Sequence, residues 1–146
     1  MGIKEEKMNP ITSYTIKRYN GFCPEDFKNF IRSRWMRSYR FGNDYIKLAD
    51  SDSYFAKYTY YLTILLSHPE MHLRIAALTE SPDVALGFSV CRGNILDYVH
   101  VQKDFRKQGI GMKLIPNGIN TFTHLTRTGI KLWSTKLPNA KFNPFA

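Results

Sequence analysis

Two glycines follow a short basic stretch in the second half of the chain, where residues 95–115 read ILDYVHVQKDFRKQGIGMKLI. Glycine at the start of a helix lets backbone N–H groups approach a bulky anion, and the unpaired N–H groups attract phosphate. Arg106 and Lys107 add positive charge beside Gly109 and Gly111. The segment therefore predicts a phosphate-binding turn. It is neither a nucleotide P-loop, which needs Lys-Ser/Thr after its last glycine, nor a GxGxxG turn.

One carboxylate lies in the strand that we expect before this turn. Asp97 precedes Val99 by two residues, which puts both side chains on the same predicted strand face. A carboxylate there could serve as a general base, or it could be a solvated strand-end group or the partner of a neighbouring arginine. His100, on the other face, is expected to be a packed, neutral histidine.

Other residue types with chemical potential carry weaker patterns. His68 and His72 are spaced like a helical zinc pair, but a proline between them opposes the helix and no third ligand is evident, so no metal site is predicted. His124 is expected to be a structural or acceptor-site polar residue. Cys23 and Cys91 are too few and too far apart for a disulfide scaffold or a cysteine zinc site, which favours a reducing, cytoplasmic location.

Composition narrows the class of protein. The 146 residues are 43% hydrophobic and 23% charged, which is typical of one globular domain spanning residues 1–146. No apolar run approaches the roughly 18 residues of a membrane span, and the first ten residues have no apolar core of a signal peptide. The net charge of +9 favours an anionic partner, which could be nucleic acid, a phosphorylated cofactor or an acidic protein face, or it indicates only a solvated basic surface.

Periodicity and turn residues predict the elements that must position these groups. The predicted strands are 11–18, 73–79, 85–91, 95–101 and 130–135; the predicted helices start at Pro24, at Ser51 or Asp52 as N-cap, and at Gly109. Residues 1–10 are expected to be flexible and 136–146 irregular. Three sequential strands imply an antiparallel meander, and a helix between strands 95–101 and 130–135 implies a parallel crossover. The fold class is therefore α+β, with a mixed, mostly antiparallel sheet and helices on both faces.

The turn and the order of elements together resemble a known superfamily. The motif V-x-x-x-F-R-x-x-G-I-G resembles the central acyl-CoA motif of the GNAT superfamily of acyl-CoA-dependent N-acyltransferases; it is spelled by Val101, Phe105, Arg106, Gly109, Ile110 and Gly111. The strand order agrees over residues 11–135, with a shortened C-terminal part. The segments RSRWMRSYR, FTHLT and KFNPF also resemble small GNAT-like proteins of tailed bacteriophages.

The resemblance implies a cofactor site. The backbone of five consecutive residues would cradle the CoA pyrophosphate, with Arg106 and Lys107 nearby: Gln108, Gly109, Ile110, Gly111 and Met112. The pantetheine arm would lie along strand 95–101, where the Val99 N–H would polarise the thioester carbonyl and Val101 would bond to the arm. The acceptor amine would enter between strands 95–101 and 130–135.

The resemblance also assigns catalytic candidates. Asp97 would be the general base. Many members protonate the departing CoA thiolate with a tyrosine, but no tyrosine follows Tyr98, so Ser134 or Thr135, or water, would take that role. The aromatic position itself would fall to Phe142.

Two functions follow from these observations. The first is an acetyl-CoA-dependent N-acyltransferase that acts on an amine by direct transfer, without a metal. The second is a non-catalytic GNAT-like binding protein, phage-encoded and located in the host cytoplasm, that contacts nucleic acid or a host protein. The arginines of residues 32–40, interleaved with Trp35 and Tyr39, either belong to a helix that stacks on bases and contacts phosphates or lie solvated behind a core face. The resemblance implies that this helical region borders the acceptor entrance, where it would select an acidic or nucleic-acid acceptor. Both a monomer and a homodimer are compatible with the sequence.

Overall fold

The structure, a computed structural model, describes residues 13–20, 22–106 and 108–146. The predicted flexible segment 1–10 and Lys107 lie outside the described residues. The elements are, in chain order, β1 (Tyr14–Asn20), α1 (Glu25–Gly42), the 3₁₀ turn η1 (Ile46–Leu48), α2 (Ser51–Leu65), β2 (Met71–Leu78), β3 (Ala85–Arg92), β4 (Ile95–Val101), the 3₁₀ turn η2 (Lys103–Phe105), α3 (Ile110–Leu114), β5 (Thr121–Phe122), α4 (Arg127–Lys136) and β6 (Lys141–Phe142).

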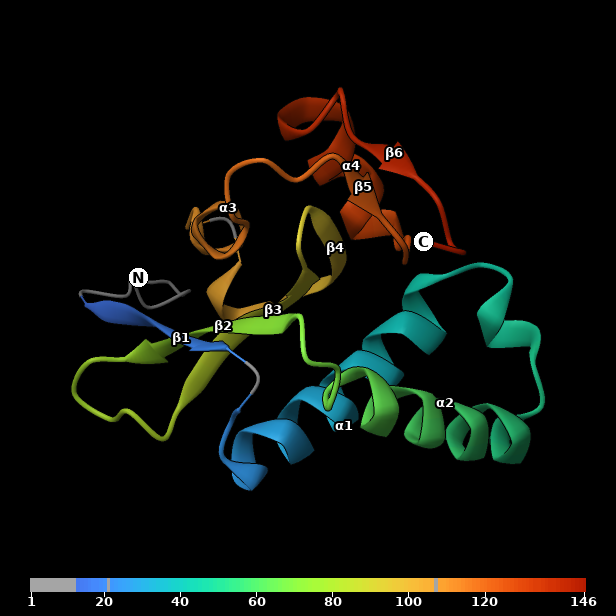
Figure 1. Cartoon of the computed structure of the whole chain (residues 1–146), viewed down its shortest axis with the longest axis horizontal. Coiled ribbons are helices and arrows are strands. Elements are labelled where there is room, and N and C mark those ends of the chain that lie inside the picture. The colour runs from blue at the N-terminus through green and yellow to red at the C-terminus, as the bar shows by residue number, and fades with distance from the viewer. Residues whose placement is uncertain (1–12, 21, 107) are drawn as a thin grey trace, which may run out of the picture.

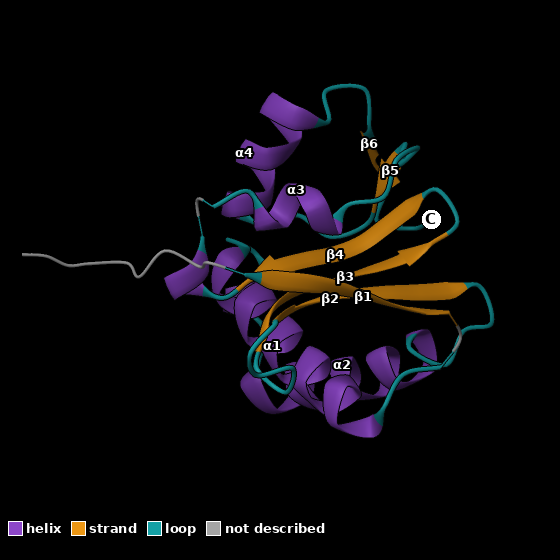
Figure 2. Cartoon of the chain, turned by 90° about the vertical axis from the view of Figure 1, so that its left-hand side faces the viewer, coloured by secondary structure: helices purple, strands orange, loops and turns teal. Residues whose placement is uncertain are grey.

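The strands form one six-stranded sheet in the order β1-β2-β3-β4-β5-β6. Strands β1 to β4 pair antiparallel, whereas β5 runs parallel to both β4 and β6. Helices α1 and α2 cover one face of the sheet, and α3 and α4 lie on the other (Figures 1 and 2). The predicted fold class, a mixed and mostly antiparallel sheet with helices on both faces, is confirmed.

Helix α1 is amphipathic, and its apolar side forms much of the core. Ile31, Trp35 and Tyr39 are buried at a spacing of four residues, which places them on one helix face. Trp35 stacks on Tyr98 of β4 with ring centroids 4.7 Å apart. Of the two interpretations of the arginine-rich helix, the core face is therefore confirmed. Helix α2 is capped by Asp50, which accepts a hydrogen bond from the Ser53 amide, one residue before the expected N-cap.

The predicted strand 130–135 is wrong, because these residues lie in helix α4. Thr126 caps this helix by accepting a hydrogen bond from the Gly129 amide at 2.9 Å. Leu132 and Trp133 pack against the cluster around Phe122, so a helical apolar face, and not a strand, is buried here. Two short strands take part in the sheet instead, β5 next to β4 and β6 within the segment expected to be irregular.

Candidate functional site

Strands β4 and β5 separate soon after they pair. Their register contains only the pairs Ile95–Thr121 and Leu96–Phe122, followed by a hydrogen bond from the Thr123 amide to the Leu96 carbonyl. Beyond this point the chain of β5 leaves the sheet and continues into α4 (Figure 2). The opening predicted between two long strands therefore lies between β4 and the segment that joins β5 to α4.

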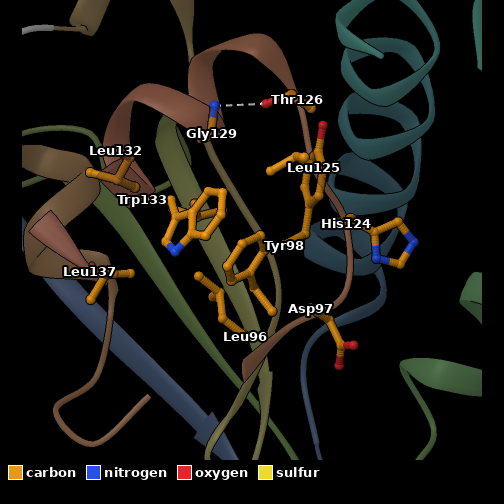
Figure 3. A pocket seen from close by; sticks show the side chains of 12 residues that line it. Leu96, Asp97, Tyr98, His124, Leu125, Thr126, Gly129, Leu132, Trp133 and Leu137 are labelled. Atoms are coloured by element: carbon orange, nitrogen blue, oxygen red, sulfur yellow. Dashed lines mark hydrogen bonds between the residues drawn. The ribbon is translucent and has the colours of Figure 1, made fainter. Parts of the chain in front are cut away.

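A small pocket, with a cavity volume of about 40 Å³, occupies this opening. Its lining is largely apolar and comes from β4, β5, the following loop and α4: Leu96, Asp97, Tyr98, Val99, Phe122, His124, Leu125, Thr126, Gly129, Leu132, Trp133 and Leu137 (Figure 3). Trp133 is held by a hydrogen bond from its indole N–H to the Ala140 carbonyl at 2.8 Å. The lining places apolar side chains beside the β4 backbone.

The predicted phosphate-binding turn follows β4 after the short 3₁₀ turn η2. Gly109 is the N-cap of α3 and has a φ of +78°, a left-handed conformation that glycine adopts without strain. A Cβ atom built on Gly109 meets no atom within 4 Å, so open space faces this turn. Arg106 donates from Nε to the Val101 carbonyl at 2.9 Å, which ties the turn to the end of the strand. Helix α3 is short because Pro116 disfavours helical backbone at the residue before it.

The turn and the pocket adjoin through two side chains. Val99 packs both against the cluster of Leu96 and Phe122, which lines the pocket, and against the cluster of Ile110 in α3. Met112, from the glycine turn, packs against the pocket-lining cluster as well. Val99 and Met112 therefore connect the pocket to α3, although the lining of the pocket itself includes only Val99 among the predicted cofactor residues that the structure describes.

Asp97 is fully buried and paired with an arginine. Its two carboxylate oxygens accept hydrogen bonds from Arg92 Nε and Nη2 at 2.6 and 2.8 Å, and one of them also accepts from the Thr123 hydroxyl at 2.8 Å. A β-bulge explains its position: Tyr98 lies opposite Val90 and the next paired residue is Leu96, which leaves Asp97 without an opposite residue. The alternation on which its predicted strand face rested is interrupted at this point. Of the three interpretations of Asp97, the structure shows the arginine partner.

His124 lies at the centre of an aromatic cluster. Its ring contacts those of five aromatic residues at centroid distances of 4.9–6.2 Å, namely Trp35, Tyr39, Tyr58, Tyr61 and Tyr98. Nδ1 lies 2.8 Å from the Thr123 hydroxyl and Nε2 lies 3.3 Å from the Tyr58 hydroxyl. Burial lowers the pKa of His124 to about 4, so the ring is neutral at pH 7.

The remaining predicted residues lie apart from the pocket. Ser134 is exposed on α4, and its hydroxyl donates to the Lys131 carbonyl at 3.2 Å. The side chain of Thr135 is outside the described part of the structure. Phe142 packs on Phe122 with ring centroids 5.5 Å apart. His100 packs on the ring of Phe88, and burial lowers the pKa of His100 to about 4, as expected for a neutral histidine.

Three contributors to the site were missed by sequence reasoning. Arg92 and Thr123 hold Asp97, and Trp133 lines the pocket from a helix that was predicted as a strand. The Thr-His pair within FTHLT was the only available signal, and it gave no indication of a contact with β4. Within the described residues, no group of three His, Cys, Asp or Glu side chains could hold a metal ion. No described helix combines the length and the apolar character needed to cross a membrane.

Comparisons with known proteins bear on the fold. No protein-family model and no curated protein sequence matches the chain. Among solved structures, a protein described as an acetyl transferase from Pyrococcus furiosus superposes with a TM-score of 0.51 at 18% identity, covering 90% of this chain and 80% of that one. A ribosomal-protein-alanine N-acetyltransferase from Brucella melitensis has a TM-score of 0.42 at 14% identity, covering 89% and 77% of the two chains. The aminoglycoside enzyme AAC(6')-Iy, bound to a bisubstrate analogue that contains CoA, has a TM-score of 0.39 at 16% identity, covering 90% and 78%. The chain has the fold of GNAT acetyltransferases.

Proposed function

We propose that this protein is an acetyl-CoA-dependent N-acyltransferase that transfers the acyl group directly to an amine. The observation that carries the proposal is the separation of β4 from β5, which opens an apolar pocket beside β4 at the edge where the glycine turn begins. A CoA thioester has matching parts, since a charged diphosphate precedes a long, thin arm. The fold, shared with the Pyrococcus furiosus protein, supports the same function.

The residues at the turn fit the diphosphate end of the cofactor. The space in front of Gly109 is open to a bulky anion, and Gly109, as the N-cap of α3, has no side chain that could cap the first turn of this helix. The backbone from Gln108 to Met112 would bind the diphosphate, with Arg106 close by and Lys107 between them in the sequence.

The β4 strand fits the arm and the thioester. The arm would extend along Val101 and Val99 into the pocket, between the strand and α4. CoA supplies an activated acyl group with a good leaving group. The Val99 N–H would hold the thioester carbonyl and stabilise the negative charge that develops on its oxygen. The apolar lining around Trp133 would exclude water from the reacting carbon.

A calorimetric titration of acetyl-CoA into the purified protein tests the proposal. We expect saturable binding by the wild type and no measurable binding by Gly109→Glu, which places an acidic side chain in the space meant for phosphate. Gly93→Glu is the matched control, because Gly93 in the β3–β4 hairpin also has a positive φ, of 55°, and open space within 4 Å. Absence of binding by folded wild type, or an equal loss in both variants, would refute the proposal.

One observation favours a second candidate function, that of a binding protein for nucleic acid or an acidic protein. A groove between α1 and α2 is lined by basic and polar side chains together with Met36 and Phe55, and includes Arg32 and Arg37. An affinity for DNA that falls steeply with salt and is unchanged by CoA would support this function. An affinity that does not depend on salt would exclude its nucleic-acid form.

A further inference from the structure

A continuous chain of polar contacts connects the buried ion pair to the aromatic cluster. Arg92 holds Asp97 through two hydrogen bonds, and the Thr123 hydroxyl donates to Asp97 Oδ1 at 2.8 Å. The same hydroxyl oxygen lies 2.8 Å from His124 Nδ1, and His124 Nε2 lies 3.3 Å from the Tyr58 hydroxyl. The chain thus links β3, β4, the segment after β5, and α2.

The direction of these hydrogen bonds determines which nitrogen of His124 carries the proton. The Thr123 hydroxyl has a single hydrogen, and its contact with the Asp97 carboxylate uses that hydrogen. The hydroxyl can then only accept from Nδ1, so Nδ1 must be protonated. Because a neutral imidazole carries one proton, Nε2 keeps its lone pair.

The second contact agrees with this assignment. Burial raises the pKa of the Tyr58 hydroxyl well above its ordinary value, so this group stays protonated and can donate to Nε2. At 3.3 Å the Tyr58 contact is longer than a strong O–H···N bond. An incoming N–H group can therefore take its place at Nε2.

The position of the ring agrees with a role toward an acceptor. Figure 3 shows the His124 ring on the side of its loop that faces α1 and α2, whereas Leu132 and Trp133 lie on the other side of that loop. His124 therefore lines the end of the pocket that faces α1 and α2, and Leu132 and Trp133 line the other end. Tyr61, which neighbours the ring at 6.0 Å, is 38% exposed, so solvent reaches this side of the cluster.

We propose that His124 Nε2 is the general base of the acyl transfer, and that Thr123 and Asp97 are positioning residues that fix its tautomer. This assignment rests on the proposed function. As the amine nitrogen bonds to the thioester carbon, its proton passes to Nε2, the C–S bond breaks, and the electron pair leaves with the CoA sulfur. The imidazolium then returns its proton to solvent and the thiolate takes one up, so that amine and thioester become amide and thiol.

The surroundings of the ring suit this step. Asp97 is connected to the His124 ring through the Thr123 hydroxyl, and Arg92 pairs with Asp97. The other titratable groups around the ring are tyrosines of α1, α2 and β4, namely Tyr39, Tyr58, Tyr61 and Tyr98. The negative charge of Asp97 favours the imidazolium once it forms. The N–H of an amine becomes strongly acidic when the nitrogen bonds to a carbonyl carbon, so a weakly basic imidazole is sufficient to remove its proton.

Long-range ¹H–¹⁵N NMR of the folded wild type at pH 7 tests the positioning without any turnover. We expect a protonated Nδ1 and an unprotonated Nε2 for His124. Thr123→Val, which keeps the side-chain shape but removes the hydroxyl, should allow the other tautomer to appear, and Thr123→Ser should restore the wild-type spectrum. Thr121→Val is the matched control, because Thr121 lies in the same segment and its hydroxyl donates to the side chain of its neighbour Asn120 at 2.9 Å.

The release of CoA thiol from acetyl-CoA, with benzylamine or water as the acceptor, tests the base. We expect His124→Gln to lower kcat by at least about 100-fold, while the variant still binds acetyl-CoA. Thr123→Val should lower kcat by at least about tenfold, and Thr123→Ser should recover most of it.

Any other result refutes the positioning by Thr123, the general base or the proposed function. A wild type with a protonated Nε2 refutes the positioning by Thr123, whether or not the protein is an enzyme. A wild type that binds acetyl-CoA but releases no thiol, or whose kcat is unchanged in His124→Gln, refutes the base while the proposed cofactor site survives. A folded wild type that binds no acetyl-CoA refutes the proposed function and the base with it, whereas the tautomer is still decided by NMR.

Discussion

Acidification is expected to destabilise this protein through two half-buried histidines, His100 and His124. His100 and His124 both have a pKa that burial lowers from 6.5 to about 4. Between these two values the unfolded chain binds protons that the folded protein does not bind. The free energy of unfolding therefore falls as the pH falls from 6.5 toward 4, and it is unaffected by these groups above pH 6.5.

The size of the loss of stability follows from the difference between the histidine pKa values in the unfolded and folded states. Lowering the pH from 7.5 to 4.5 should cost about 2.5 kcal/mol for each histidine, and about 5 kcal/mol for both. That loss is a large part of the stability of a domain of this size, which is on the order of 5–15 kcal/mol. Asp50, whose pKa is lowered by the hydrogen bonds from Ser53, loses its contribution below pH 4, outside this range.

Urea unfolding, followed by the fluorescence of the buried Trp35, measures the free energy of unfolding at each pH. His100→Gln should retain about half of the acid-dependent loss, and the double variant with His124→Gln should show almost none between pH 6.5 and 4.5. If the double variant loses as much stability as the wild type over this range, the burial of these two rings is not the cause. A wild-type curve that is flat over the range would contradict the reasoning altogether.

Three further predictions concern the buried groups of the fold. Arg92→Met leaves the buried Asp97 carboxylate without its partner and should lower the free energy of unfolding by about 3–5 kcal/mol. Arg127→Met removes an exposed ion pair and should lower it by less than about 1 kcal/mol. Urea unfolding measures both values, and equal losses would contradict the difference in burial. Gly87→Ala places a Cβ 2.5 Å from a backbone oxygen of β4, so it should lower the melting temperature of the protein or abolish its folding, and a variant as stable as the wild type would be inconsistent with this close approach. Burial raises the pKa of the thiol of Cys23 to about 11 and of Cys91 to about 12, so neither should react with a disulfide reagent at pH 8 until the protein unfolds, and rapid reaction of the native protein would show that a thiol is accessible.

The parts of the fold that could be predicted depend on local patterns. The strands from Met71 to Val101 are separated by turn residues and are rich in apolar residues, and the apolar face of α1 follows helical spacing. Gly109 marked the start of α3 because few other residues adopt its backbone conformation. These signals act over a few residues, so one sequence was sufficient to predict the order of the first elements and the place of the phosphate-binding turn.

Helix α4 shows where local patterns were insufficient. Residues 130–135 contain Ile, Leu and Trp, which suit a short strand as well as a helix. Their packing against Phe122 and the cap from Thr126 decide for the helix, and both depend on where β5 ends. The prediction of a strand failed because the deciding contacts are made by neighbouring segments.

The sequence by itself determined the order of the elements as far as α3, the basic charge and the glycine turn, because each depends on adjacent residues. Only the tertiary structure decided what Asp97 does. Its contact with Thr123 joins residues 26 positions apart, and it exists because a bulge displaces Asp97 and β5 pairs in parallel with β4. The same pairing places His124 among tyrosines from helices that precede it by more than 60 residues. The spacing of residues along the sequence does not predict such contacts, since they arise from the way the sheet and its helices pack.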